Sequence, residues 1–209
     1  MVLVAITRHG ETTWNMEGRY QGRLESALSA LGVRQAEALA ERMSADPPQR
    51  IVSSPLLRCT ATAQFVATRV NVPIETDDRL IEIAHGDWEG RLRDDLAAND
   101  PERYRTWRER PAEVSFVGGE SLRDVMERWK DFARSLRPDR PTLIVTHDAV
   151  VRCAILDITR RPLEEFWQVP FENAALALCS VEQDAWHMVN ALDNAHLAGL
   201  RADVAGQAL

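Results

Sequence analysis

The sequence predicts an α/β fold, a three-layer α/β/α sandwich with a mostly parallel central sheet. Short apolar runs typical of buried strands alternate with helix-length amphipathic segments in the first part of the chain. Residues 79–120 interrupt this alternation and contain no strand pattern, which predicts a helical excursion. Two β-rich segments lie near the end of the chain. The expected order is therefore βαβαβ, the excursion, then a strand, a helix and a hairpin.

Four runs rich in apolar or β-branched residues predict the parallel strands. They are Val2–Ile6, Arg50–Ser53, Pro73–Thr76 and Thr142–Thr146. Ala174–Val181 and Trp186–Leu192, joined through Gln183-Asp184, predict an antiparallel pair. Because connections between neighbouring parallel strands pass over the sheet faces, we expect helices on both faces.

Helices are expected where apolar residues recur at helical spacing behind a capping residue. These are residues 30–43 after Ser29, a helix after Ser54-Pro55 with Arg58 in its first turn, Pro101–Arg110, a helix that begins at Ser121 with Asp124 in a capping box, and Ala149–Ile158. In the helix after Ser121, the apolar stripe from Leu122 to Leu136 predicts a core face. Residues 8–28 are predicted as one long polar loop.

The chain of 209 residues predicts one domain over residues 1–197 and a flexible tail over residues 198–209. A net charge of −7 argues against nucleic acid and anionic membranes as general partners. Cys59, Cys153 and Cys179 are widely spaced and lie in apolar patterns, which indicates free thiols in a reducing compartment. We expect a cytoplasmic protein, with a homodimer as one possible assembly.

Polar side chains follow three predicted strands where each strand ends. Arg8 and His9 come after the first strand, Arg58 follows the second through a helix N-terminus, and His147 follows the strand Thr142–Thr146. Ligands bind beyond the carboxyl ends of strands in open α/β sheets. Guanidinium groups and a helix N-terminus favour a compact anion, so phosphate is the obvious candidate ligand.

Several motifs resemble those of the histidine phosphatase superfamily, also called the phosphoglycerate-mutase-like family, and this resemblance covers nearly the whole chain. The blocks are Arg8-His9-Gly10-Glu11-Thr12 with Asn15, Gln21-Gly22, 53–63, 82–90, 118–121, Val145-Thr146-His147 and 194–197. A single Arg-His-Gly triplet would be weak, whereas these blocks occur in order. The match from Glu82 to Gly90 favours the phosphatase branch.

The resemblance implies a phosphomonoesterase that acts through a phosphohistidine on His9. Arg8, Arg58 and His147 would bind the phosphoryl group, and Glu82 would donate and accept the proton. The implied substrate-binding residues are Asn15, Gln21 and Gly22. Trp14 either lines the substrate pocket or packs beneath its loop. No cofactor or metal is implied, and the substrate would be a small phosphorylated metabolite, such as a sugar phosphate or a phosphoglycerate derivative. The excursion 79–120 would lie over the active site.

One position departs from the family pattern, because Asp148 follows His147 where the family usually has glycine. A carboxylate aimed at a phosphate would oppose its binding. The milder interpretation is that Asp148 lies in a first helical turn with its side chain turned toward substrate hydroxyls or away. This residue leaves room for a non-catalytic member that only binds phosphorylated ligands.

Two further activities are compatible with these residues. A mutase-type phosphotransferase would use the same chemistry, and a metallohydrolase would use His9, His147 and Asp148. The general acid is also open to question, because Glu82 has other carboxylates nearby, namely Glu75, Asp87 and Glu89. The histidines His85 and His187 have no motif support and are predicted to be structural.

Overall fold

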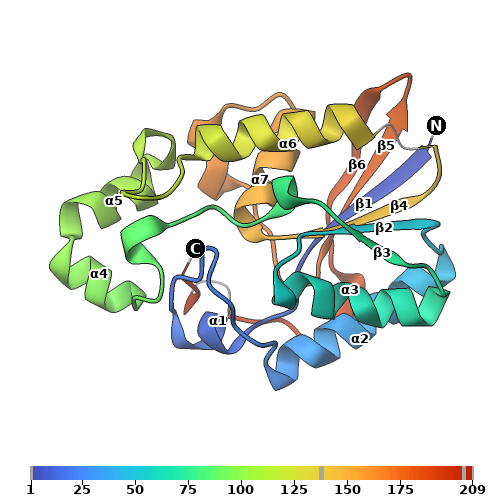
Figure 1. The fold of residues 1–209 in the computed structure, drawn as a ribbon, viewed down its shortest axis with the longest axis horizontal. Coiled ribbons are helices and arrows are strands. Elements are labelled where there is room, and N and C mark those ends of the chain that lie inside the picture. The colour runs from blue at the N-terminus through green and yellow to red at the C-terminus, as the bar shows by residue number, and fades with distance from the viewer. Residues whose placement is uncertain (1, 137–138, 204–205, 209) are drawn as a thin grey trace.

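The computed structural model describes residues 2–136, 139–203 and 206–208, and its centre is a six-stranded sheet of order β3-β2-β4-β1-β5-β6 (Figure 1). The strands are β1 (Val2–Arg8), β2 (Arg50–Ser53), β3 (Ile74–Thr76), β4 (Thr142–Thr146), β5 (Leu176–Glu182) and β6 (Ala185–Asp193). The first four run parallel, and β5 and β6 are antiparallel. The predicted mostly parallel sheet is confirmed.

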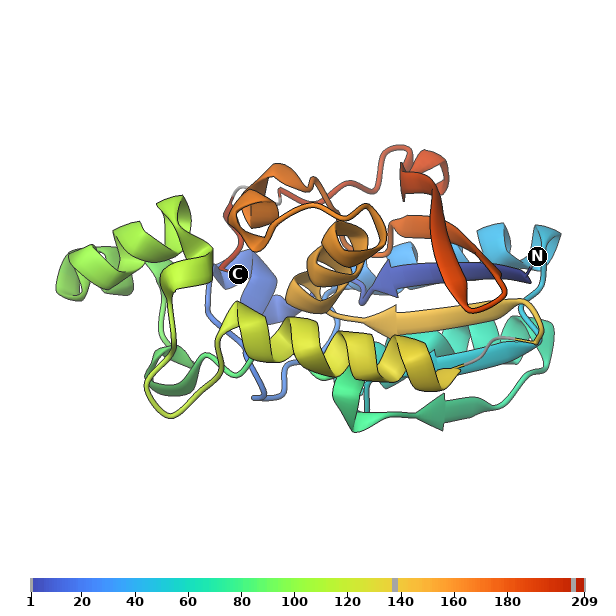
Figure 2. The same cartoon turned by 90° about the horizontal axis from the view of Figure 1, so that it is seen from above.

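Helices cover both faces of this sheet, which gives the three predicted layers (Figures 1 and 2). One face carries α2 (Ala30–Ala45) and α3 (Leu57–Val70), and the other carries α6 (Leu122–Leu136) and α7 (Asp148–Ile158). The core lies between these layers, and β4 is buried along its whole length. On α6 the predicted stripe is confirmed, since Leu122, Val125, Trp129 and Phe132 are at most 2% exposed.

The excursion extends beyond the carboxyl ends of the parallel strands, where Figure 1 shows it at the left. It contains α4 (Arg93–Asn99), α5 (Pro101–Glu109) and the short 3₁₀ helices η1 (Asp78–Leu80), η2 (Gly86–Trp88) and η3 (Pro111–Glu113). Trp88, Trp107 and Phe116 pack edge to face inside it, with ring centroids of Phe116 5.2 Å and 5.1 Å from those of Trp88 and Trp107. This aromatic cluster gives the excursion a core of its own.

Two local predictions are wrong. The polar loop 8–28 contains a short helix, α1 (Thr13–Glu17), because Thr12 and Asn15 form a reciprocal capping box and Gly18 ends the helix in the left-handed region. Ser54 is not the N-cap of α3, whose first helical residue is Leu57 rather than Pro55. The Ser54 hydroxyl instead accepts from the Leu56 N–H and lies against His147.

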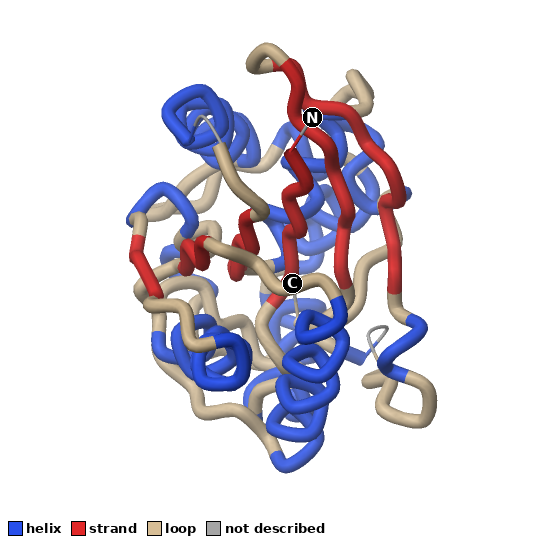
Figure 3. Tube along the Cα trace, turned by 90° about the vertical axis from the view of Figure 1, so that its right-hand side faces the viewer, coloured by secondary structure: helices blue, strands red, loops and turns tan. Residues whose placement is uncertain are grey.

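The last part of the chain forms the hairpin at one edge of the sheet, and the first strand of this hairpin, β5, pairs with β1. Gln183 and Asp184 both have positive φ (48° and 66°), as the tight turn of the predicted hairpin requires. Two further 3₁₀ helices, η4 (Leu163–Gln168) and η5 (Ala195–Leu197), connect the elements. β1 lies inside the sheet, between β4 and β5 (Figure 3). Among the described residues, no helix has the length and apolar character needed to cross a membrane.

Candidate active site

The carboxyl ends of β1, β4 and β2 lie side by side and bring the predicted site residues together. The His9 N–H donates to the Thr146 carbonyl at 2.9 Å, and the Ser54 N–H donates to the Val145 carbonyl at 2.9 Å. These backbone bonds continue the parallel ladders past the strand ends. The imidazoles of His9 and His147 consequently meet edge to face, with ring centroids 5.3 Å apart.

His9 is held as a neutral imidazole. Its Nδ1 lies 2.7 Å from the Gly10 carbonyl oxygen, and because a carbonyl only accepts, Nδ1 carries the proton. The Nε2 lone pair is therefore available. Burial, followed by the charges of Arg58 and Arg8, lowers the pKa of His9 well below its ordinary value. The site thus offers an unprotonated ring nitrogen between two guanidinium groups.

His147 occupies the N-cap position of α7 and is completely buried. Its Nε2 lies 2.8 Å from the Ser54 hydroxyl and 3.3 Å from the Cys59 sulfur. Burial lowers the pKa of His147 well below its ordinary value, and the nearby Arg58 charge lowers it further. The second histidine is therefore also neutral, with its ring contacted by Ser54, which directly follows β2, and by Cys59 of α3.

Arg58 extends from the first turn of α3 toward the loop before α2. Its Nη1 donates to the Leu24 carbonyl at 2.9 Å, and its Nη2 donates to the Gly22 carbonyl at 2.7 Å. The side chain is 1% exposed. Arg58 therefore connects the N-terminus of α3 to the loop that carries Gln21 and Gly22.

Three buried nitrogen donors of predicted site residues lack any hydrogen-bond partner within the described part of the chain. They are Nε of Arg8, Nε of Arg58 and Nδ2 of Asn15. Buried donors are rarely left unpaired, because each lost hydrogen bond costs about 1–3 kcal/mol. Two of the three belong to guanidinium groups. This set of donors fits an anion with several oxygen atoms, such as a phosphoryl group.

Glu82 follows η1 and is 6% exposed. Its Oε1 accepts from the Ile83 N–H at 2.9 Å, and the Leu80 carbonyl beside it accepts from the Thr146 hydroxyl at 2.7 Å. Burial raises the pKa of Glu82, and the negative charge of Asp148 raises it further. The carboxyl group is thus suited to hold a proton and release it.

The neighbouring carboxylates have structural partners instead. Glu75 pairs with Arg50 at 2.6 Å, and Asp87 pairs with Arg103 at 2.7 Å. Glu89 accepts from the His85 N–H at 3.0 Å. The geometry therefore favours Glu82 over these three carboxylates as the general acid.

The carboxylate of Asp148 contacts two arginines. Its Oδ1 lies 3.3 Å from Nη1 of Arg8, and its Oδ2 lies 2.5 Å from Nε of Arg152. Both of its oxygens therefore contact guanidinium groups, which compensate the charge of the carboxylate. Sequence reasoning missed Arg152, although its spacing of four residues from Asp148 on one helix was a usable signal.

Gln207 is a further residue that sequence reasoning missed. The predicted tail contains it, yet its side chain is 3% exposed, and its Oε1 accepts from Nη2 of Arg8 at 2.6 Å. Its Nε2 donates to Asn173 at 2.9 Å. No local sequence pattern predicts that Gln207 contacts a residue 199 positions earlier in the chain.

The other predicted residues lie near the site with different roles. The Oε1 of Gln21 accepts from the hydroxyls of Thr12 at 3.0 Å and Ser26 at 2.5 Å. Trp14 is half-buried, and the Cζ atom of the Arg19 guanidinium lies 5.5 Å from the centroid of its ring.

In the described ranges, no group of three or more His, Cys, Asp or Glu side chains is placed to hold a metal ion.

The two histidines predicted to be structural, His85 and His187, have different surroundings. His187 is exposed on β6. His85 is 3% exposed, and its ring lies 4.8 Å from that of Phe116 and 5.0 Å from that of Tyr20, between centroids. Neither histidine is among the residues at the strand ends.

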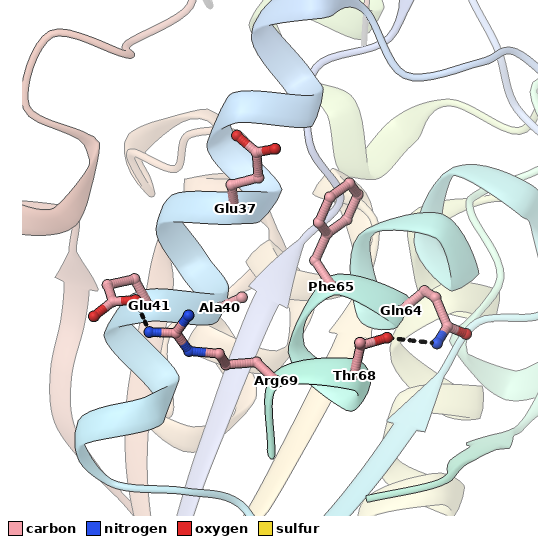
Figure 4. A pocket seen from close by; sticks show the side chains of 7 residues that line it. All are labelled: Glu37, Ala40, Glu41, Gln64, Phe65, Thr68 and Arg69. Atoms are coloured by element: carbon pink, nitrogen blue, oxygen red, sulfur yellow. Dashed lines mark hydrogen bonds and ion pairs between the residues drawn. The ribbon is translucent and has the colours of Figure 1, made fainter. Parts of the chain in front are cut away.

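An open pocket between α2 and α3 contains none of these site residues (Figure 4). It is lined by Glu37, Ala40, Glu41, Gln64, Phe65, Thr68 and Arg69. Arg69 pairs with Glu41 across it, and Gln64 donates to Thr68 at 3.0 Å. Four of its polar side chains therefore pair with one another, whereas Arg8, Arg58 and Asn15 each have an unpaired donor.

The chain belongs to the histidine phosphatase superfamily (branch 1), whose family model matches residues 4–194. Phosphoserine phosphatase 1 of Hydrogenobacter thermophilus is 38% identical over 189 residues, which cover 88% of each chain. Glucosyl-3-phosphoglycerate phosphatase of Mycobacterium tuberculosis is 33% identical over 171 residues, covering 77% of this chain and 76% of that protein.

A solved structure supports the same fold. The structure of YhfR from Bacillus stearothermophilus has a TM-score of 0.90 and 30% sequence identity, and it covers 94% of this chain and 100% of its own. The predicted family and fold are therefore confirmed.

Proposed function

We propose that this chain is a phosphomonoester hydrolase that acts through a phosphohistidine on His9. The observation that carries the proposal is the combination of three buried, unpartnered donors of Arg8, Arg58 and Asn15 with a neutral imidazole on which the two arginine charges act. A phosphoryl group would accept from all three donors. Positioned charge on its oxygens is the main contribution that a protein makes to phosphoryl transfer.

In the first step, the Nε2 lone pair of His9 attacks phosphorus, and the bond from phosphorus to the ester oxygen breaks. Glu82 gives its proton to that leaving oxygen. In the second step, Glu82 takes a proton from water, whose oxygen attacks phosphorus and breaks the bond to His9. Inorganic phosphate leaves, and both residues return to their starting states. Arg8, Arg58 and His147 bind the phosphoryl oxygens throughout.

The proposed substrate is a small phosphorylated metabolite, such as a sugar phosphate or a phosphoglycerate derivative. Two relatives are named for phosphoserine and for glucosyl-3-phosphoglycerate. Gln21 and Gly22 would contact the leaving group, because their loop is held against Arg58. The three described cysteines are free and buried, which supports the proposal of a cytoplasmic protein. The homodimer stays a prediction.

A panel of phosphomonoesters, assayed with EDTA present, tests this proposal. We expect turnover by the wild type, loss of turnover in His9→Ala, and an acid-labile phosphoenzyme in rapidly quenched wild type only. His187→Ala is the matched control, because this histidine is exposed on β6, and it should retain full turnover.

Three results would contradict the assignment. Undiminished turnover by His9→Ala would remove the nucleophile. Loss of wild-type activity in EDTA would point to a metallohydrolase. Activity that requires a bisphosphorylated primer would point to a mutase, which must protect the same phosphohistidine from water.

A further inference from the structure

Both terminal nitrogens of the Arg8 guanidinium group donate hydrogen bonds to buried side chains. Nη1 donates to Asp148 at 3.3 Å, and Nη2 donates to Gln207 at 2.6 Å. The side chain is completely buried, and Nε is the nitrogen without a partner. The guanidinium therefore presents one defined donor edge, and the orientation of that edge depends on its two partners.

Asp148 is itself fixed by a second arginine. Its Oδ2 accepts from Nε of Arg152 at 2.5 Å, one helical turn later on α7. Nη1 of Arg152 donates to the carbonyl oxygens of Phe166 and Val169, and its guanidinium lies 5.3 Å from the ring centroid of Trp167. A continuous chain of contacts thus runs from Arg8 through Asp148 and Arg152 to η4.

All members of this chain are shielded from water. The side chains of Arg8, Asp148 and Arg152 are 1%, 2% and 6% exposed. Asp148 therefore has neither a free oxygen nor an exposed surface with which to bind an ammonium or hydroxyl group of a substrate. A buried carboxylate between two guanidinium groups instead fixes the direction of both forks.

We propose that Asp148 and Arg152 are positioning residues for phosphoryl transfer: Asp148 orients the Arg8 guanidinium toward the phosphoryl group, and Arg152 orients Asp148. The inference rests on the proposed function. It gives the aspartate that replaces the family's usual glycine a definite role, and it extends the site to a residue that never contacts substrate. Preorganised donors accelerate a reaction only if they are already aimed where charge develops.

The experiment compares four variants with 4-nitrophenyl phosphate as substrate and orthovanadate as inhibitor. Asp148→Asn keeps the volume and one acceptor oxygen, Asp148→Ala removes both oxygens, and Arg152→Lys keeps the charge without the planar fork. Arg161→Gln is the matched control, because Arg161 pairs with Glu165 through Nε at 2.6 Å with the same spacing of four residues, but at a far less buried position.

We expect Arg152→Lys and Asp148→Ala to lower kcat by about 10- to 100-fold. KM should change by less than about 3-fold, because Arg58 and Asn15 still bind the phosphoryl group. Orthovanadate should bind more weakly in proportion to kcat/KM. Asp148→Asn should retain more activity than Asp148→Ala, and Arg161→Gln should match the wild type. A purely structural role would change the melting temperature without this split between kcat and KM.

Values of kcat within twofold of the wild type for both Asp148→Asn and Arg152→Lys would overturn the inference, even if Asp148→Ala fails to fold. Failure of the proposed function looks different, because the wild type itself would then not turn over the ester. In that case calorimetry with orthovanadate decides the inference. Weaker orthovanadate binding by the same two variants supports the positioning role, and unchanged binding rejects it.

Discussion

Arg58 donates to the carbonyl oxygen of Gly22 at 2.7 Å, and this bond joins two parts of the site that are 36 residues apart in the sequence. A second bond from Arg58 to Leu24 extends the contact along the same loop. Both terminal nitrogens hold the loop, and Nε has no partner among the described residues. In the proposed mechanism, one arginine therefore holds this loop and also contributes positive charge to the phosphoryl site.

Replacement of Arg58 by lysine should lower kcat by about 10²- to 10³-fold, because the three N–H groups of lysine share one nitrogen, which cannot occupy the separate positions of Nη1, Nη2 and Nε. KM should rise as well, since the loop with Gln21 loses its anchor. Steady-state kinetics measure both effects. Arg69→Lys is the control, because Arg69 lies on the same helix, is exposed, and pairs with Glu41 away from the site. Equal kinetics for the two variants would contradict this role of Arg58.

The pH profile of kcat/KM should fall on both sides of an acidic to neutral optimum. His9 must be neutral to attack, and its pKa lies well below the ordinary value, so activity is lost only at low pH. Glu82 must hold a proton, and its pKa is raised, so activity falls as the pH increases through that raised value. Asp148→Asn should move the alkaline limb to lower pH, since the Asp148 charge helps to raise the pKa of Glu82. An alkaline limb that stays in place would contradict this coupling.

Glu82→Gln should abolish most activity and yet stabilise the fold at neutral pH. A carboxyl group whose pKa is raised in the folded state opposes folding once it ionises, so its cost appears as the pH rises above the unfolded pKa and vanishes at low pH. The amide removes this cost and keeps the oxygen that accepts from Ile83. Each kcal/mol gained raises Tm by about 2–4 °C in a chain of this size. Thermal unfolding at neutral and at low pH tests the sign, and an equal Tm difference at both would refute it.

Gly86→Ala should destabilise the excursion more than Gly118→Ala does. Both glycines have positive φ (54° and 70°), so both alanines incur the left-handed backbone cost of about 1–2 kcal/mol. A Cβ at Gly86 would lie 2.0 Å from the Val117 carbonyl oxygen, whereas nothing lies within 4 Å at Gly118. We expect a further loss of about 1–3 kcal/mol for Gly86→Ala. Urea unfolding measures the difference, and equal losses would show that the loop moves aside.

The sequence predicts the fold and the central residues well because both depend on local patterns. A buried parallel strand needs a continuous apolar run, and residues that directly follow such runs must meet at one sheet edge. This is why His9 and His147 are found together. Arg58 follows from the same logic through the helix after β2.

The contacts that complete the site are not local. Gln207 reaches Arg8 across 199 positions, and no spacing rule predicts that pairing. The helix α1 has only five residues, and its formation depends on the Thr12–Asn15 capping box rather than on apolar periodicity. Ser54 looks like a helix cap in sequence, but its hydroxyl is occupied by His147. Tertiary partners decide each of these cases.

The place of β1 in the sheet also determines when the site can form during synthesis. The strand that ends at Arg8 is synthesised before its neighbours β4 and β5, so Val4 has to wait for Thr142 and Cys179 before it can pair. Such long-range pairing is slow to form and leaves early strands without partners. A nascent chain that ends before β4 therefore carries the His9 motif on an unpaired strand. His9 can therefore take its place beside His147 only after β4 has been synthesised.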